Sequence, residues 1–332
     1  MFSYKKFTKI GDVEKDWLEL QKNNEQLDAM AEFEFVKTFF SGITNKLKSL
    51  LKKGSQNVFV EVLKNDKPIL IFPAVIGDEI VSSYTLDYYD VVSAKDLSKE
   101  DFLQALEFVA NEEQKDIVLK KLKTGKNAHA KLDGLVEFET LSNCVKISYT
   151  ESYDDYYQSM SKNARQNLRT AYNRIATDGL KFEFEFFMGK TEKKLAKKLK
   201  NIYLNRRASK YKNMNFLKKL LYKIDEPISK VCFGLENSFS AVVKLDSKPV
   251  AFMAGVVKNG EAVVPRLAID DRFARYSTGV ILVNETIKKF IEQKVFILDL
   301  ATGEEKYKFQ MGGELHTNYQ VTIKYQKNNK NS

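Results

Sequence analysis

Cysteine and histidine are scarce in this 332-residue sequence, which contains two of each. Cys144 and Cys232 each lie in an apolar, strand-like run, so we expect two buried thiols and no disulfide framework. His129 and His316 are far apart, and neither has a Cys or another His at ligand spacing. This argues against a zinc site or a Cys–His nucleophile pair. We therefore expect no metal, and any catalysis must use carboxylates, Tyr, Lys, Arg or the backbone.

Long apolar runs are also missing. No stretch reaches the roughly eighteen apolar residues that a bilayer span requires, and the first residues, MFSYKKFTKIGDVEKDW, carry charges throughout instead of the apolar core of a secretory signal. We expect a cytoplasmic protein with no membrane span. The 54 Lys and Arg exceed the 44 Asp and Glu, which gives a net charge of +10. This excess suits an anionic partner such as a nucleotide, a sugar phosphate or a nucleic acid, although lysine-rich coding bias would give the same excess.

The sequence does contain an internal echo. Residues 60–76, VEVLKNDKPILIFPAVI, align without gaps to residues 241–257, AVVKLDSKPVAFMAGVV, at an offset of 181 residues. In both copies apolar strands flank a pair of turn-forming residues, which predicts a β-hairpin. After each hairpin, a further short strand leads into an amphipathic helix, at 100–112 and at 279–292.

Helical spacing of apolar residues also predicts helices before each hairpin, at 33–40 and 43–53 in the first half and at 191–208 and 216–224 in the second. A chain of this length favours two domains. The whole pattern predicts a duplicated α+β unit, with mixed β-sheets flanked by helices, and we place the two domains at 1–150 and 151–332.

A possible anion site lies in residues 274–290, ARYSTGVILVNETIKKF. Here a strand leads through a turn into a helix, whose first N–H groups and dipole favour a negative charge, while Gly279 allows a phosphate to approach the backbone. Arg272 and Arg275 add positive charge. The alternative is an ordinary helix N-cap by Ser277 or Thr278.

A second candidate site follows the next strand, in DLATGEEKYKFQMGG, residues 299–313. If this strand and the strand at 262–269 are parallel neighbours on either side of the helix, both end at one edge of the sheet. Tyr307 then lies beyond that edge, where a phenol can protonate a departing thiolate, and Lys308 faces another way. The alternative is a Tyr that packs on the rim of the sheet.

The helix around 160–176 places Arg165 nearly in line with its apolar stripe. An inward guanidinium needs an anion, which is either a structural carboxylate, such as that of Asp154 or Asp155, or a phosphate or carboxylate of a substrate.

These stretches together resemble the GNAT acyltransferase superfamily, and more narrowly the CelD/BcsL-like acetyltransferases of exopolysaccharide biosynthesis, whose fold is similar to that of the FemAB aminoacyltransferases. The resemblance rests on residues 159–179, 272–290 and 298–312, and on the echo. It implies two tandem GNAT-like halves, the first of them degenerate. The first half fits this, because its stretch SAKDLSKEDF at 93–102 is acidic and has no Gly at the corresponding turn.

The resemblance also implies an acyl-CoA co-substrate, acetyl-CoA or another acyl-CoA, whose pyrophosphate binds at the start of the helix. The usual signature has Arg or Gln, then Gly, then Gly or Ala, where this chain has Ala274, Ser277 and Gly279. The implied cofactor-binding residues are Arg272, Arg275, Tyr276, Ser277, Thr278, Gly279 and Val280.

In the same way, the resemblance implies Tyr307 as general acid, with Asp299 and Glu304 as the carboxylates nearest to the acceptor. Arg165, Arg169 and Lys308 would bind an anionic acceptor, such as a sugar nucleotide. The function so implied is acyl transfer from acyl-CoA to an amine, as in an amino sugar of a surface polysaccharide precursor. Two alternatives stay open: a FemAB-like transferase that uses aminoacyl-tRNA, and a non-catalytic binding module that holds a polysaccharide-synthesis partner or a nucleic acid.

Overall fold

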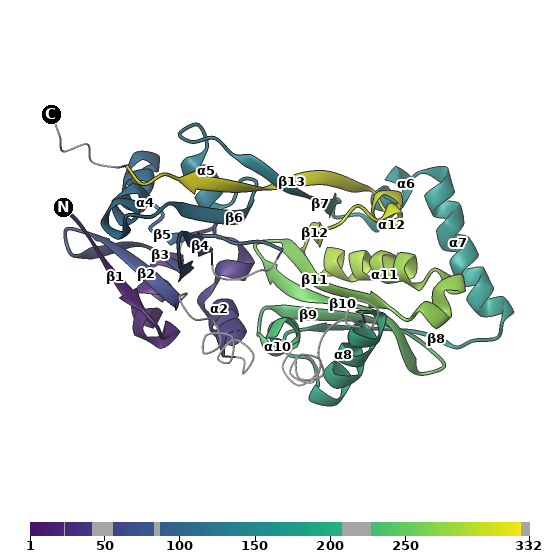
Figure 1. Cartoon of the computed structure of the whole chain (residues 1–332). Helices are drawn as coiled ribbons and strands as arrows, with labels where there is room; N and C mark the ends of the chain where they lie inside the picture. Colours follow the sequence, from purple (N-terminus) through teal and green to yellow (C-terminus); the bar gives the residue numbers. More distant parts are fainter. Residues whose placement is uncertain (23, 42–55, 83–86, 208–226, 327–332) are drawn as a thin grey trace. The chain divides into compact units, whose positions relative to one another are not determined.

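The computed structural model describes residues 1–22, 24–41, 56–82, 87–207 and 227–326 (Figure 1). The helices expected at 43–53 and 216–224 lie outside the described residues. The chain divides into two compact units, the first made of residues 1–142 and 317–332 and the second of residues 143–316. The predicted domains at 1–150 and 151–332 follow the repeat along the sequence, whereas these units group the residues that pack together.

Unit 1 is a mixed β-sheet with helices. Its strands, in order across the sheet, are β1 (Phe2–Phe7), β2 (Gln56–Lys64), β3 (Lys67–Ile76), β4 (Ile80–Ser82), β6 (Ile117–Lys123) and the last part of β13 (Gly313–Ile323), while β5 (Val92–Ser93) pairs with β3. Its helices are η1 (Ile10–Val13), α1 (Glu14–Gln21), η2 (Ala29–Ala31), α2 (Phe33–Phe40), α4 (Lys99–Glu113) and α5 (Asn127–Leu132). The end of the chain joins this unit because β13 pairs antiparallel with β6.

Unit 2 repeats this plan. Its strands, in order, are the last part of β7 (Glu139–Ser148), β12 (Ile297–Thr302), β11 (Glu261–Ile269), β10 (Lys248–Lys258), β9 (Ser238–Leu245) and β8 (Phe182–Met188). Its helices are α6 (Tyr153–Ser159), α7 (Lys162–Thr177), α8 (Lys193–Arg207), α10 (Pro227–Gly234), η4 (Asp271–Tyr276), α11 (Thr278–Glu292) and α12 (Lys306–Gln310).

The two faces of the unit 2 sheet carry separate cores. Alternate residues of β9 point to opposite faces, as strand geometry requires. Val243 packs in the cluster that includes α7 and α11, whereas Val242 packs in the cluster that includes α8 and α10. Ile281, Ile287 and Phe290 of α11 are fully buried, and burial of side chains of this size stabilises the fold by about 1.5–3 kcal/mol each. The apolar face of α11 therefore fixes this helix on the sheet.

The internal echo is confirmed as two hairpins of the same design. β2 and β3 are joined by Asn65 and Asp66, and β9 and β10 by Asp246 and Ser247, all four with φ between 49° and 62°. Two consecutive left-handed residues give the tight hairpin turn that matches the twist of paired strands. The similarity extends to an irregularity, because the pairing register of β3 skips residue 69 and that of β10 skips residue 250, again 181 positions apart.

Gly255 of β10 is required by a close approach of the backbone. A Cβ atom at this position would lie 1.8 Å from the carbonyl oxygen of Val263 on β11. We predict that Gly255→Ala lowers the free energy of unfolding by roughly 3 kcal/mol or more, because backbone atoms have to move. Urea unfolding would measure this. Gly11→Ala is the control, since no atom lies within 4 Å of the added Cβ, and equal stability of both variants would contradict the packing described here.

Besides Asp28 and Asp90, unit 1 buries the carboxyl group of Glu61 on β2. The side chain is 2% exposed, and burial, together with the neighbouring Asp16 carboxylate, raises its pKa to about 7. Because this pKa is higher in the folded than in the unfolded state, the contribution of Glu61 to stability is present at low pH and is lost as the pH rises through 7. Ionised Glu61 therefore destabilises the fold above neutral pH.

Glu61→Gln removes the ionisable group and with it this destabilisation. We predict that the variant matches the wild type at pH 5 and is more stable at pH 8 by on the order of 2 kcal/mol, measured by urea unfolding at both values. Glu34→Gln changes a side chain that is 63% exposed and serves as the control. A variant that loses stability between pH 5 and pH 8 as steeply as the wild type would contradict the assignment.

Candidate functional site

The two predicted sites belong to one βαβ segment of unit 2. β11 and β12 are parallel neighbours, and the chain passes from one to the other through η4 and α11. Their pairing covers only three positions, Glu261 with Ile297, Ala262 with Leu298, and Val263 with Asp299. Among the described residues no pairing follows, although β11 continues to Ile269 and β12 to Thr302. The strands thus separate at Asp299 and leave edges with which an extended ligand could pair.

Asp299 shapes the strand at the point of separation. It is fully buried, and its Oδ1 accepts a hydrogen bond of 2.8 Å from the amide of Ala301. Ala301 has φ 54°, and the register of β12 against β7 shifts between Asp299 and Thr302. A residue in the left-handed region within a strand is typical of a bulge. Lys121 of β6 has φ 65° at the corresponding place in unit 1, so the bulge belongs to the repeat.

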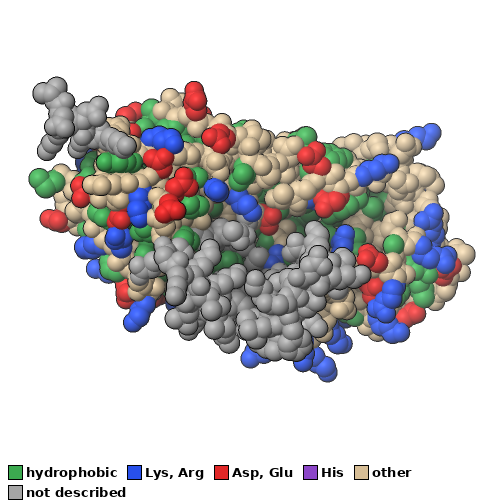
Figure 2. Space-filling model, viewed as in Figure 1, with side chains coloured by type: hydrophobic (Ala, Val, Ile, Leu, Met, Phe, Trp, Pro, Cys, Tyr) green, Lys and Arg blue, Asp and Glu red, His purple; other side chains and the backbone are tan. Residues whose placement is uncertain are grey.

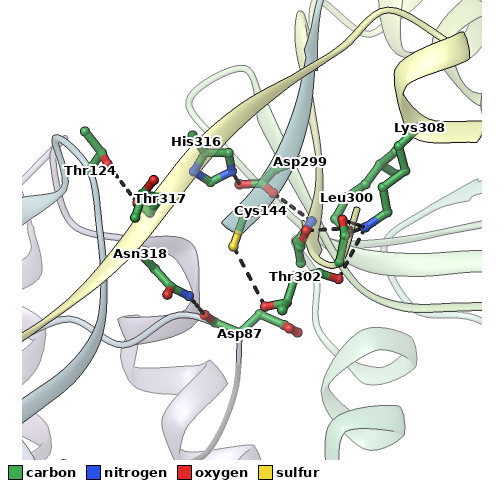
Figure 3. Close-up of polar contacts among 12 residues, drawn as sticks. Asp87, Thr124, Cys144, Asp299, Leu300, Thr302, Lys308, His316, Thr317 and Asn318 are labelled. Carbon is green, nitrogen blue, oxygen red and sulfur yellow. Dashed lines mark hydrogen bonds and ion pairs between the residues drawn. The ribbon is translucent and has the colours of Figure 1, made fainter. Parts of the chain in front are cut away.

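Asp299 also contacts a residue that the sequence did not single out. Its Oδ2 lies 3.4 Å from Nε2 of His316, whose side chain is 9% exposed (Figure 3). A buried carboxylate beside an imidazole orients the ring. Asp299 itself is fully buried and does not face solvent. The scarcity of histidine was the one feature of the sequence that drew attention to His316. No residue near either position in the sequence indicated that His316 lies beside Asp299.

Lys308 holds the loop that follows β12. Its ammonium group is 2% exposed and donates to the carbonyl oxygens of Leu300 at 2.9 Å and Gly303 at 3.0 Å, with longer contacts to those of Ala301 and Thr302 (Figure 3). Glu305 completes the shell with an ion pair of 3.0 Å. Lys308, predicted to bind the acceptor, is thus engaged by the protein's own backbone.

Tyr307 precedes this lysine on α12 and is half-buried against the core of unit 2. Burial and the nearby Glu305 carboxylate raise its pKa, while Arg206 opposes the shift. The phenol is therefore protonated at neutral pH and remains a proton donor. Among the described residues none forms a hydrogen bond with its hydroxyl group. The hydroxyl oxygen is also absent from the fully buried polar atoms that lack a partner. Glu304 is exposed, and its Oε1 accepts a hydrogen bond from Asn143.

The start of α11 has the backbone of an anion site. Ser277 has φ 50° and ψ 41°, and its side chain makes no cap bond. The amides of Val280 and Ile281 donate to the carbonyl of Ser277, at 2.9 and 3.3 Å. Within the described chain no acceptor binds the amides of Thr278 and Gly279, and the buried Oγ1 of Thr278 has no partner. Buried donors without acceptors are costly and rare, so an acceptor from a ligand would satisfy them.

Gly279 also has a packing role. A Cβ here would lie 2.5 Å from Cδ1 of Ile269 at the end of β11. From the sequence we expected Gly279 to let a phosphate approach the backbone. In the structure the missing side chain also lets α11 begin close to the end of β11.

The remaining residues predicted to bind the cofactor form η4 and its contacts. Arg272 pairs with Asp270 at 2.6 Å and lowers the pKa of that carboxyl. Arg275 pairs with Asp178 at 3.0 Å, and the hydroxyl of Tyr276 donates to the same carboxylate at 2.6 Å. That hydrogen bond raises the pKa of Tyr276. Both arginines are thus bound to carboxylates beside the start of α11.

Arg165 and Arg169 lie elsewhere on α7. Arg165 donates to the carbonyl oxygens of Gln158 and Met160, both at 2.8 Å, so its inward position is explained by carbonyl groups at the end of α6. Arg169 is exposed and bonds Gln166. Thirteen residues of helix, about 20 Å, separate Arg165 from Asp178. The structure therefore does not bring these arginines to the start of α11.

Comparison with known families agrees with this geometry. Residues 162–309 match the family model of the acetyltransferase (GNAT) domain. Over this segment the chain is similar to GNAT acetyltransferase domains. The matched segment runs from the start of α7 to α12 and includes the separated strands, the start of α11 and Tyr307. A search of the curated proteins finds no significant match.

Several solved structures share the whole fold. FemX has 10% sequence identity and a TM-score of 0.60, and the match covers 96% of this chain and 97% of FemX. A domain of a proposed lysylphosphatidylglycerol synthetase from Agrobacterium fabrum has 12% identity and a TM-score of 0.57, covering 95% and 92%. L-PGS from Bacillus licheniformis has 13% identity and a TM-score of 0.54, covering 92% and 94%. The predicted fold class, an α+β chain of two tandem GNAT-like halves, is confirmed.

The described residues contain no group of three His, Cys, Asp or Glu that could hold a metal ion. In that same part of the chain, no helix has the length and hydropathy needed to cross a bilayer.

Ser277 occupies a left-handed position that glycine would adopt without strain. We predict that Ser277→Gly preserves or raises the free energy of unfolding, by up to about 1 kcal/mol, and that Ser277→Val lowers it by about 1–2 kcal/mol, since a β-branched residue is strained at positive φ. Thermal unfolding monitored by circular dichroism measures both variants. Loss of stability in the glycine variant would show that the Ser277 side chain, and not its backbone, shapes the turn.

Proposed function

We propose that the protein transfers an acetyl or other acyl group from acyl-CoA to an amine. The observation that carries this proposal is the pair of amides at Thr278 and Gly279, with the unpaired Thr278 hydroxyl beside them, within a segment that matches a GNAT domain. A diphosphate would supply the acceptors that these donors lack, and the helix dipole favours its charge. Arg272, Arg275, Tyr276, Ser277 and Val280 would complete the cofactor site.

The acyl chain would extend from that site between the separated ends of β11 and β12. The acceptor amine attacks the thioester carbon, and a backbone N–H at the strand edge stabilises the oxyanion. Tyr307 donates its proton to the departing thiolate. Of the two predicted carboxylates, Glu304 is exposed and can meet the amine directly, whereas Asp299 acts through His316.

The proposed acceptor is an amino sugar of a cell-surface polysaccharide precursor, carried by a nucleotide or phosphate. This follows from the resemblance to the CelD/BcsL-like acetyltransferases. Arg165, Arg169 and Lys308 were expected to hold its anionic group. Arg169 is the one of the three whose side chain is exposed, since Lys308 is buried and Arg165 is bonded to carbonyl groups.

A second candidate is transfer from an aminoacyl-tRNA. It is favoured by α8, which contains no acidic residue and exposes Lys193, Lys194, Lys197 and Lys198, a charge pattern suited to phosphates. The face shown in Figure 2, by contrast, has acidic and basic side chains interspersed. A salt-sensitive gel shift with tRNA would support this reading, and thermal stabilisation by acetyl-CoA and not by tRNA would exclude it.

Replacing Tyr307 by Phe tests the proposed reaction. The variant loses the proton donor but keeps the ring that packs on the core, so we predict a fall in kcat of about 10²-fold or more with little change in KM for acetyl-CoA. The assay follows release of the coenzyme A thiol in the presence of a panel of nucleotide-linked amino sugars.

Tyr157→Phe is the matched control, because it removes the hydroxyl of another half-buried tyrosine of unit 2. A Tyr307→Phe variant with unchanged kcat would rule out the phenol as general acid. Absence of thiol release with every acceptor and with water would favour the third reading, a binding module.

A further inference from the structure

The start of α11 is closed in this structure. Thr278 is fully buried and Gly279 is buried as well, so neither amide faces solvent. η4 directly precedes them and carries both Arg275 and Tyr276. A diphosphate can reach these buried amides only if the residues around them move, and η4 is the segment that directly precedes them.

The carboxylate of Asp178 links the end of η4 to α7. Asp178 accepts the hydroxyl hydrogen of Tyr276 at 2.6 Å and pairs with Arg275 at 3.0 Å. Arg174 adds a bond of 2.9 Å from its guanidinium to the carbonyl of Arg275. Asp178 and Arg174 lie at the last turn of α7, far from η4 in the sequence. Side-chain contacts thus join η4 to the C-terminal end of α7.

The position of Asp178 is unfavourable for α7 itself. It is the C-cap residue of this helix, and a negative charge at a helix C-terminus opposes the helix dipole. The hydroxyl and the guanidinium from η4 offset that charge. Because the Asp178 and Arg275 side chains are 28% and 64% exposed, their ion pair is weak enough to exchange.

We propose that Asp178 acts as an internal competitor of the donor diphosphate, holding η4 over the amides of Thr278 and Gly279 until phosphate oxygens replace its carboxylate at Arg275. This inference rests on the proposed function and adds a regulation of the same site. A phosphate presents the same kind of acceptor to Arg275 as a carboxylate does, with more charge. Coenzyme A would therefore open η4 by exchange of one anion for another.

Two variants loosen η4 in different ways. Asp178→Asn removes the charge, keeps an acceptor for Tyr276 and relieves the C-terminus of α7, so the helix is expected to fold. Tyr276→Phe removes the hydroxyl link without changing charge. Glu292→Gln is the control, because it removes one negative charge from an exposed pair at the far end of α11.

The first measurement is hydrogen exchange of the Thr278 and Gly279 amides without any ligand. We expect roughly fivefold faster exchange in Asp178→Asn and in Tyr276→Phe, the effect of losing a contact of about 1 kcal/mol, and no change in Glu292→Gln. Unchanged exchange in both variants would overturn the inference, whatever coenzyme A does.

The second measurement is calorimetric titration with acetyl-CoA, inorganic pyrophosphate and pantetheine. We expect Asp178→Asn to bind the two diphosphates about fivefold more tightly than the wild type does, with pantetheine and the Glu292→Gln control unaffected. Equal affinity of wild type and Asp178→Asn for both diphosphates would overturn the competition. Tighter pyrophosphate binding without any acetyl-CoA binding would uphold the inference and contradict the proposed function.

Discussion

The candidate site depends on the early end of pairing between two parallel strands. β11 and β12 share only three paired positions, and the bulge at Ala301, whose amide bonds the carboxylate of Asp299, follows directly after the last of them. Unpaired strand edges expose N–H and C=O groups that a ligand can use. Without this separation the start of α11 and Tyr307 would flank a closed sheet, and no extended thioester could lie between them.

Buried ionic groups in unit 2 serve mainly to hold this arrangement. Lys308 donates to carbonyl groups at the end of β12 and in the loop that follows, while Asp299 accepts from the amide of Ala301 and lies 3.4 Å from Nε2 of His316. A buried charge persists only where the backbone or an opposite charge compensates it. These residues are therefore best understood as supports of the loop that carries Tyr307. The groups that can meet a substrate are the less buried ones near them, such as Glu304.

Local patterns in the sequence predicted the local parts of the fold. The hairpins follow from two-residue turns, Asn65-Asp66 and Asp246-Ser247, between apolar strands, and α11 follows from its apolar face; both are confirmed. The parallel pairing of β11 and β12 is also confirmed. Each of these depends on residues within a few positions of one another, where turn chemistry and periodicity decide the conformation.

Contacts across long sequence separations were not predictable in the same way. Pairing of β13 with β6 leaves no local signal, and His316 approaches Asp299 from 17 positions further along the chain. Asp178 and Arg275 are 97 positions apart, so the sequence showed an available arginine but not the carboxylate that holds it. Arg165 illustrates the same limit, since its position on the helix was evident and its carbonyl partners at the end of α6 were not.

The central claim is that the amides that open α11 bind the diphosphate of the donor. The most direct measurement is a titration of isotope-labelled wild-type protein with coenzyme A, followed through the NMR signals of the backbone amides. The account predicts that the signals of Thr278 and Gly279 move downfield and show the largest changes in the protein, as expected for amides that gain a charged acceptor. Unmoved signals at these two residues, with the main changes located on another surface such as α8, would contradict it.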